Sequence, residues 1–244
     1  ADKNLELAKN LRLRFLRSSS ASLPPAVFEK LNKVFGCPVI EAYGMTEATH
    51  QMTSNPLPPN KQKPGFVGIP AGPEVCIMNE KGKILNKGEE GEICIKGPNV
   101  TLGYENNPEA NKKSFSNGWF RTGDQGYFDQ SGYLKISGRL KEIINKGGEK
   151  ISPLEVDNIL IDHPLIEQAV CFGYKDKMLG EEIAAAIIIK EGQNCSETDI
   201  KNYAEEKLAK FKIPKKFFFV NEIPKGATGK LQRNVLAKNF GLNN

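Results

Sequence analysis

Histidine is scarce, cysteine is odd in number, and long apolar runs are missing from this 244-residue sequence. The two histidines, His50 and His163, argue against a multi-histidine metal centre. The longest apolar run, residues 183–189, is far too short to cross a bilayer. The five cysteines lack metal-like spacing. Three lie in strand-like segments, where a thiol behaves as a small buried hydrophobe, so we predict structural cysteines in a reducing compartment: Cys76, Cys94 and Cys171.

A strong excess of one charge is also absent. The chain has 34 Lys and Arg against 29 Asp and Glu, and its net charge of +5 favours anionic ligands only slightly. We therefore predict no nucleic-acid partner. Internal repeats, low-complexity tracts and an opening secretory signal are missing too, and the first residue is not Met. We expect that part of the protein lies upstream of this sequence.

The first part of the chain has the pattern of a parallel sheet. Residues 11–16 alternate apolar and polar side chains, which predicts a strand. Pro24 and Pro25 open a helix that Gly36 ends, and residues 38–40 predict a second, buried strand. Strand, helix and strand in succession are typical of an α/β layer.

From about residue 64 the pattern changes to short alternating runs separated by glycine and asparagine turns. These runs predict a small antiparallel sheet or barrel. They cover residues 74–78, 91–96, 126–128 and 133–137.

Helices and strands alternate again after Arg139. Ser152-Pro-Leu-Glu155 and Ser196-Glu-Thr-Asp199 each predict a helix start with a capping box. Residues 170–172 and 183–189 predict strands. The second helix has an apolar face at helical spacing, made of Ile200, Tyr203, Ala204, Leu208 and Phe211.

The predicted fold class is α/β plus α+β. A partial α/β layer (residues 1–63) and a β-rich, barrel-like subdomain (64–140) form one part, and a small α+β domain (141–244) forms the other.

The first motif that can carry chemistry is Glu41-Ala-Tyr-Gly-Met-Thr-Glu47, which we expect in a loop at a sheet edge. Tyr43 can stack on a purine, the Thr46 hydroxyl can bond a phosphate oxygen, and Glu47 can hold Mg²⁺. Taken alone, the motif is also compatible with an ordinary polar turn.

Three further motifs follow. In Gly118-Trp-Phe-Arg-Thr-Gly-Asp124 the aspartate can accept hydrogen bonds from both ribose hydroxyls, or simply close a turn. In residues 137–153, Arg139 offers a planar donor fork, and Gly147 and Gly148 allow close approach to the backbone or form a turn. In residues 224–230, Lys230 lies in a glycine-rich loop where its ammonium can meet developing negative charge or remain solvated.

In this order and spacing, the four motifs resemble the adenylate-forming superfamily of acyl-CoA synthetases, luciferases and peptide-synthetase adenylation domains. The resemblance covers essentially the whole chain. It implies an ATP-dependent, AMP-forming acyl-CoA ligase that uses ATP, Mg²⁺ and coenzyme A. It also implies that Tyr43, with Gly44 beside it, faces adenine. Thr46 would contact the α-phosphate and Glu47 the magnesium ion.

The resemblance implies further roles. Asp124 and Arg139 would hold the ribose, and Lys230 would stabilise the adenylation transition state. Lys141 matches the hinge between the large domain and a mobile small domain. Rotation about that hinge would bring Gly147 and Gly148 to the pantetheine tunnel.

The family's phosphate loop, a Ser/Thr-Gly-rich stretch ending in Pro-Lys-Gly, is absent from this sequence. We therefore expect a C-terminal fragment that cannot catalyse adenylation alone.

Within the superfamily the chain resembles the oxalate–CoA ligases. The resemblance is carried by residues 17–23, 41–50, 54–58 and 145–153. Most relatives have glycine and alanine where this chain has Ser19 and Ser20, and these residues would line the acyl pocket with Ala21 and His50. The second carboxylate of oxalate needs hydrogen-bond donors and positive charge, which Ser20 and His50 can supply.

Alternatives remain open at this point. The serines can bond their own backbone and His50 can be structural, in which case another small acid or an aryl acid such as coumarate is the substrate. The chain can also belong to a domain that loads a carrier protein, or be a non-catalytic binding module that uses its lysines at 207–216. The last residues lack a Ser-Lys-Leu peroxisomal address, so we expect the cytoplasm.

Overall fold

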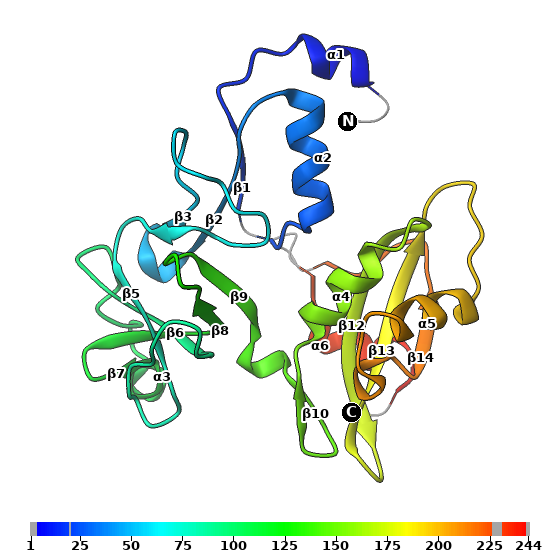
Figure 1. The fold of residues 1–244 in the computed structure, drawn as a ribbon. Coiled ribbons are helices and arrows are strands. Elements are labelled where there is room, and N and C mark those ends of the chain that lie inside the picture. Colours follow the sequence, from blue (N-terminus) through cyan, green and yellow to red (C-terminus); the bar gives the residue numbers. More distant parts are fainter. Residues whose placement is uncertain (1–3, 20, 226–230, 243–244) are drawn as a thin grey trace. The chain divides into compact units, whose positions relative to one another are not determined.

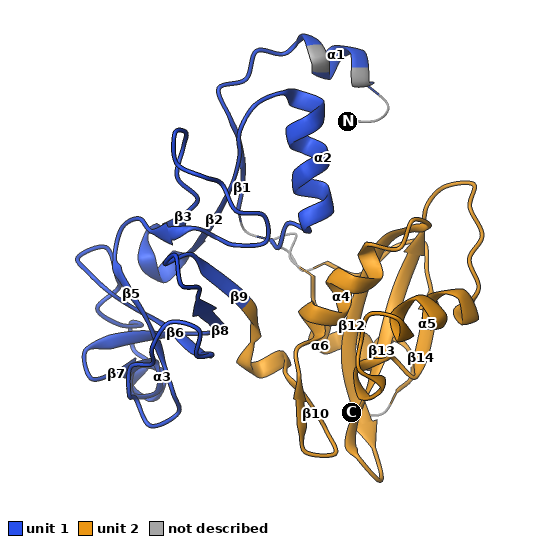
Figure 2. Cartoon of the chain, in the orientation of Figure 1, with its two compact units in different colours: residues 1–136 blue, residues 137–244 orange. Residues whose placement is uncertain are grey.

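The fold is that of a computed structural model, which describes residues 4–19, 21–225 and 231–242 (Figure 1). Ser20 and Lys230, two of the predicted site residues, lie outside the described residues. The chain forms two compact units, residues 1–136 and 137–244 (Figure 2). This division lies close to residue 140, where the sequence pattern changes.

Unit 1 opens with the α/β layer. The short helix α1 (Leu5–Asn10) contacts α2 (Pro25–Phe35), and α2 connects the parallel strands β1 (Leu16–Ser18) and β2 (Val39–Met45). The helix begins after Pro24 and ends at Gly36, whose φ of 60° is the left-handed conformation that glycine adopts readily. The antiparallel strands β3 (His50–Ser54) and β4 (Ile69–Pro70) complete the order β1-β2-β3-β4.

Two predictions for this layer were wrong. Residues 11–15 lie outside any strand, and β1 begins only at Leu16. Residues 41–45, expected in a loop, continue β2. That strand is paired on both sides, by β1 and β3, and its residues from Val39 to Tyr43 are buried, so the first half of the motif belongs to the sheet interior.

The second sheet of unit 1 has the order β5-β6-β8-β7, with β9 paired to β8. A bridge between Gly68 and Leu134 connects it to the first sheet. The predicted strands at 74–78 and 91–96 are confirmed, and residues 126–128 form the end of a longer strand. The elements are β5 (Glu74–Met78), β6 (Gly91–Lys96), α3 (Pro108–Ser114), β7 (Phe115–Ser116), β8 (Trp119–Phe128) and β9 (Leu134–Arg139).

Unit 2 is built on a five-stranded sheet in the order β11-β10-β13-β12, with β14 parallel to β13. Its strands are β10 (Ile144–Lys146), β11 (Glu149–Ile151), β12 (Ile166–Asp176), β13 (Gly180–Ile189) and β14 (Lys216–Phe219). Its helices are α4 (Pro153–Ile161), α5 (Glu197–Glu205) and α6 (Arg233–Asn239).

Both faces of this sheet are covered. Ala169 and Cys171 of β12 pack in a core with residues of α4 and α5, whereas Val170 and Phe172 pack in a second core with Leu236 of α6. Successive strand side chains point to opposite faces, so a strand buried on both sides is apolar throughout. This explains the unbroken apolar run at residues 183–189.

The two predicted capping boxes have different outcomes. Ser196 and Asp199 form the reciprocal pair at the start of α5, as predicted. Helix α4 starts at Pro153, as predicted, but its capping box does not form, because the Ser152 hydroxyl donates to the Ser137 carbonyl instead and ties the helix start to β9. Leu208 and Phe211 also lie beyond the end of α5, so the predicted helical face is shorter.

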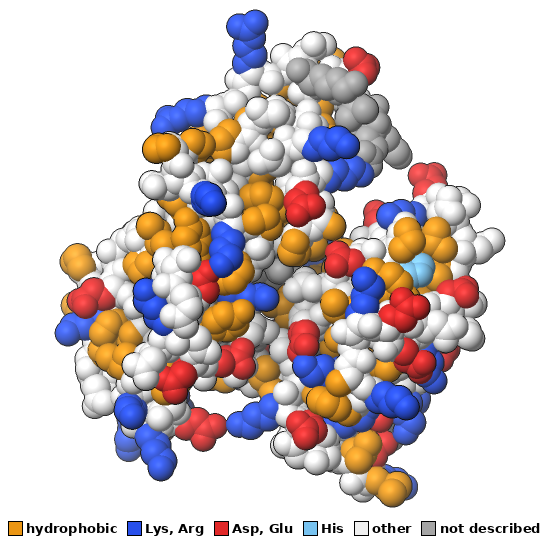
Figure 3. Space-filling view, in the orientation of Figure 1, with side chains coloured by type: hydrophobic (Ala, Val, Ile, Leu, Met, Phe, Trp, Pro, Cys, Tyr) orange, Lys and Arg blue, Asp and Glu red, His pale blue; other side chains and the backbone are white. Residues whose placement is uncertain are grey.

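Cys76, Cys94 and Cys171 are buried, as predicted. In the described part of the chain no helix is long and apolar enough to cross a membrane. Basic and acidic side chains are interspersed on the face shown in Figure 3.

Candidate functional site

The first and second motifs meet in unit 1. The Tyr43 hydroxyl on β2 donates a 2.5 Å hydrogen bond to Oδ2 of Asp124 on β8, although 81 positions separate the two residues in the sequence. Both residues are buried, Tyr43 at 9% and Asp124 at 4% exposure. An aromatic ring and a carboxylate are therefore held side by side, which suits a base and the ribose attached to it.

Gly44 has a structural role besides the nucleotide contact expected of it. A Cβ atom at this position would lie 1.5 Å from the carbonyl oxygen of His50. The pairing of β2 with β3 also shifts register between Tyr43 and Gly44. Only a residue without a side chain allows β3 to approach β2 this closely.

Glu47 lies in a 3₁₀ turn, Thr46–Ala48, directly after β2. Its Oε1 accepts a 2.8 Å hydrogen bond from the Tyr104 hydroxyl, and its backbone oxygen accepts one of 2.7 Å from the Thr101 amide. Burial and the bond to Glu47 raise the pKa of Tyr104, so the hydroxyl is a donor at neutral pH. Nothing local in the sequence indicated that Tyr104 would contact this motif.

A magnesium ion fits Glu47 as a single carboxylate ligand. Within residues 4–19, 21–225 and 231–242, no three His, Cys, Asp or Glu side chains gather as a metal cluster. Mg²⁺ commonly uses one or two carboxylates and takes its remaining ligands from water and substrate phosphates. Glu47 is half-buried, and Thr46 beside it is exposed, which leaves room for such ligands.

The predicted acyl residues lie near the same strand ends. Ser19 directly follows β1, which runs parallel to β2. The carboxyl ends of the two strands therefore lie at the same end of the sheet, so Ser19 lies at the end where β2 carries Tyr43 and Gly44. Ligands commonly bind at the carboxyl ends of parallel strands. Ser19 is half-buried and Ala21 is exposed. His50 is exposed and lies opposite Met45 in the register of β2 and β3.

The remaining predicted residues belong to unit 2. Arg139 ends β9, and Lys141 lies in the 3₁₀ turn Leu140–Glu142 that follows; both are exposed. Gly147 and Gly148 form the tip of the β10–β11 hairpin, with positive φ angles of 59° and 93°. The Gly147 amide donates to the Leu179 carbonyl at 2.8 Å, which holds the tip against the β12–β13 turn.

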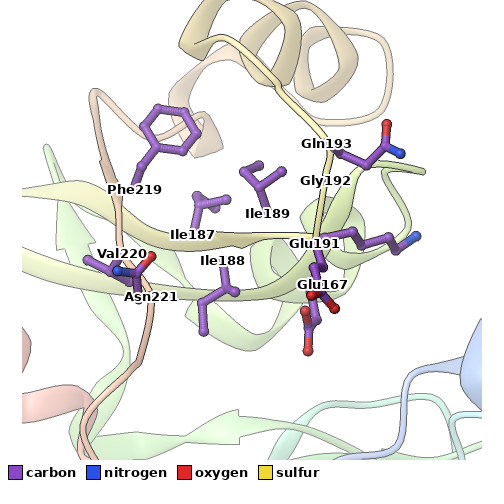
Figure 4. Close-up of a pocket in the computed structure, with 11 residues that line it drawn as sticks. Glu167, Ile187, Ile188, Ile189, Glu191, Gly192, Gln193, Phe219, Val220 and Asn221 are labelled. Carbon is purple, nitrogen blue, oxygen red and sulfur yellow. The ribbon is translucent and has the colours of Figure 1, made fainter. Parts of the chain in front are cut away.

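A pocket of about 460 Å³ in unit 2 contains none of the predicted site residues (Figure 4). It lies where β13 ends, and Phe219 of β14, which pairs with Ile187, points to the same side of the sheet as Ile187 and Ile189. Its lining combines apolar side chains with Glu167, Lys190 and Glu191, whose net charge is negative and does not suit phosphate, and no three His, Cys, Asp or Glu side chains of the described residues gather there as a metal cluster. We therefore place no nucleotide there. The lining residues are Glu167, Ile187, Ile188, Ile189, Lys190, Glu191, Gly192, Gln193, Phe219, Val220 and Asn221.

Comparison with protein families gives two matches. Residues 2–105 match the AMP-binding enzymes, and residues 155–230 match the C-terminal domain of AMP-binding enzymes. The chain belongs to the AMP-binding enzyme family.

Relatives of this chain include two oxalate–CoA ligases. The one from Arabidopsis thaliana is 56% identical over 94% of this chain and 45% of its own length. The one from Saccharomyces cerevisiae is 54% identical over 93% of this chain and 42% of its own length. The chain thus spans less than half the length of these relatives.

Solved structures agree with the family. ATP-bound MatB from Rhodopseudomonas palustris has a TM-score of 0.88 at 32% identity and covers 98% of this chain, which spans 53% of MatB. MenE, the O-succinylbenzoate coenzyme A synthetase from Bacillus subtilis, in complex with ATP and magnesium, has a TM-score of 0.85 at 35% identity. It covers 96% of this chain, which spans 49% of MenE. The predicted fold class, α/β plus α+β as in the adenylate-forming enzymes, is confirmed.

Proposed function

We propose that the chain is the C-terminal portion of an ATP-dependent, AMP-forming acid–thiol ligase that converts oxalate to its CoA thioester. The observation that supports this most directly is the hydrogen bond between Tyr43 and Asp124. It places a ring suited to adenine beside a carboxylate suited to the ribose hydroxyls. Glu47 lies four positions after Tyr43, at the end of the same strand, where the phosphates would follow.

The reaction has two steps. An oxygen of the substrate carboxylate attacks the α-phosphorus of ATP, and the bond to the bridging oxygen breaks to release pyrophosphate. The CoA thiol, losing its proton, then attacks the acyl carbon, and the bond to the phosphate oxygen breaks to release AMP.

In the first step, the Thr46 hydroxyl donates to an α-phosphate oxygen, while Asp124 and Arg139 orient the ribose. The Lys230 ammonium stabilises the charge that develops between the carboxylate and the phosphate. Glu47 would hold magnesium, which would supply further positive charge to the phosphates when bound. In the second step, Gly147 and Gly148 let the pantetheine arm approach the backbone, after a change of domain orientation about Lys141.

Oxalate is the favoured acid because the predicted acyl pocket offers the polar partners that its second carboxylate requires. Ser19 and Ser20 supply hydroxyl donors, His50 can supply a charged donor, and Ala21 leaves space beside them. The two oxalate–CoA ligases described above support the same choice.

The test is ATP-dependent CoA-thioester formation by the complete enzyme with oxalate, malonate, acetate, octanoate and coumarate. We expect a strong preference for oxalate. Preference for a longer or aryl acid would overturn the oxalate assignment but not the ligase activity. A parallel assay that offers a carrier protein in place of CoA should give no product. Loading of the carrier would overturn free CoA as the acceptor thiol.

A further inference from the structure

Asp124 lies in an irregular part of the sheet, where β8 has more residues than its partner strand β6. In the pairing of β6 with β8, Glu92 lies opposite Gln125 and Cys94 lies opposite Arg121. Ile93 alone therefore faces three residues, Thr122 to Asp124, which form a bulge. Bulges of this kind redirect side chains and are frequent beside active sites.

Glu92 holds this bulge through its side chain. Its Oε2 accepts a 2.7 Å hydrogen bond from Nε of Arg121 and forms an ion pair with Nη2 of the same guanidinium. Its Oε1 accepts a 3.0 Å bond from the Gly123 amide, which has left the regular ladder. Gly123 has a φ of 74°, so the bulge passes through the left-handed region at this residue.

Thr122 completes the arrangement. Its hydroxyl donates to the Ile93 carbonyl at 2.8 Å and accepts from the Asp124 amide at 3.1 Å. The backbone immediately before and at Asp124 is thus fixed by the side chains of Glu92 and Thr122. The next contact outward is the bond from Tyr43 to the Asp124 carboxylate.

Burial of Glu92 needs an explanation beyond stability. Its side chain is 7% exposed, and burying a carboxylate is costly unless it is paired and hydrogen-bonded. Arg121 supplies the charge and Gly123 the second donor, so the pair is well satisfied. An apolar pair would fill the same place between the strands but would leave the Gly123 amide without this acceptor.

We propose that Glu92 is a positioning residue for nucleotide recognition: by holding the Thr122–Asp124 bulge, it aims the Asp124 carboxylate at the ribose hydroxyls. The inference rests on the proposed function, because it takes Asp124 as the ribose ligand. Its role is indirect, because the Glu92 side chain is buried and both of its oxygens are bonded to Arg121 and Gly123.

The test compares ATP with 2′,3′-dideoxyATP in the complete enzyme. The ratio of their kcat/KM values reports recognition of the ribose hydroxyls, and it is independent of the fraction of enzyme that is folded. Asp124→Asn should lower the preference for ATP about tenfold or more, as expected for a lost hydrogen bond to a charged group. Glu92→Gln should lower it in the same direction by roughly three- to tenfold, because the new amide donors face those of Arg121.

Two comparisons make the result specific. Glu90→Gln, the same change at an exposed position in the same segment, should leave the ratio at its wild-type value. In the Asp124→Asn background, adding Glu92→Gln should change the ratio no further, since the carboxylate that Glu92 positions is already replaced.

Thr122 provides a second route if Glu92→Gln fails to fold. Thr122→Val removes both hydroxyl bonds and should lower the ratio. Thr122→Ser retains the hydroxyl and should keep the ratio at its wild-type value. If Asp124→Asn lowers the ratio but Glu92→Gln and Thr122→Val do not, the positioning role is overturned and the proposed function stands. If Asp124→Asn leaves the ratio unchanged, the assignment of Asp124 is overturned, and the inference with it.

Discussion

His50 stands in an unusual backbone conformation. Its φ angle is 83° and that of the preceding Thr49 is 53°, so two consecutive residues other than glycine occupy a region that L-amino acids rarely adopt. Asn99 stabilises this turn: its side-chain amide donates to the Ala48 carbonyl at 2.8 Å, and its backbone carbonyl accepts from the Thr49 hydroxyl at 2.9 Å. Strain retained in this way is a feature of functional sites, which motivates a test of His50.

We expect His50→Asn in the complete enzyme to raise the KM for oxalate about tenfold, because the imidazole donor proposed for the second carboxylate is lost. The KM for ATP should change little, which serves as the internal control. Asparagine tolerates the left-handed region, so the backbone can stay in place. Steady-state kinetics with each substrate varied in turn measure both values, and unaltered oxalate kinetics would remove His50 from the acyl site.

At the scale of an element, the segment from Gly97 to Tyr104 fastens the turn that carries Glu47. Asn99 contacts Ala48 and Thr49, the Thr101 amide contacts the Glu47 carbonyl, and the Tyr104 hydroxyl contacts the Glu47 carboxylate. Partners of this kind orient a metal-binding carboxylate and influence the affinity of its metal.

Tyr104→Phe in the complete enzyme should raise the Mg²⁺ concentration needed for half-maximal ATP binding about tenfold, since Glu47 loses an orienting donor. Calorimetric titration of ATP at several Mg²⁺ concentrations measures this without turnover. Tyr133→Phe is the matched control: its hydroxyl donates to the Lys61 carbonyl at 2.7 Å, away from Glu47. Equal Mg²⁺ dependence of the two variants would show that Tyr104 has no such role.

The sequence predicted elements best where side-chain periodicity alone decides them. The strands at 74–78 and 91–96 and the helix between Pro24 and Gly36 follow from alternation, proline and glycine. The predicted capping box at Ser152 does not form, because the Ser152 hydroxyl donates to the carbonyl of Ser137 on β9. The contacts of Tyr104 and Glu92 were missed for the same reason, because partners 57 and about 30 positions away leave no local pattern.

The motif residues were predicted because their types and spacing resemble a known family, and the structure adds what the resemblance could not supply. It shows that Tyr43 bonds to Asp124 and that Gly44 must lack a side chain. Both facts depend on how strands distant in the sequence pair with each other.

At the scale of the whole molecule, each unit has its own hydrophobic core, and unit 2 is also held by a buried ionic cluster. Arg233 at the start of α6 contacts Asp157 of α4 at 2.8 Å and Glu142 at 3.0 Å, and it donates to the Cys171 carbonyl at 2.6 Å. The Asp157 carboxylate also accepts a 2.5 Å bond from the Cys171 amide. The cluster thus connects the first and last parts of unit 2. Arg233 lies three positions beyond Lys230 in the sequence.

Arg233→Met should lower the free energy of unfolding by about 3–5 kcal/mol, because it leaves a buried carboxylate without its cation. Burial raises the pKa of Asp157, and the positive charge of Arg233 lowers it. In the variant this charge is missing, so the pKa of Asp157 is higher than in the wild type. A raised carboxyl pKa gives stability that is present at low pH and lost as pH rises through the folded-state value. The deficit relative to the wild type should therefore be larger at pH 8 than at pH 5.

Denaturant unfolding at the two pH values measures the deficit, and hydrogen exchange should locate the lost protection in residues 137–244. Adding Asp157→Asn should recover part of the stability, since the uncompensated charge is removed while an acceptor for the Cys171 amide remains. Lys212→Met is the control: it breaks the pair with Glu155, whose side chain is 46% exposed, and should cost at most about 1 kcal/mol. If Arg233→Met cost no more than this control, or equally at both pH values, the ionic cluster would not be what holds unit 2 together.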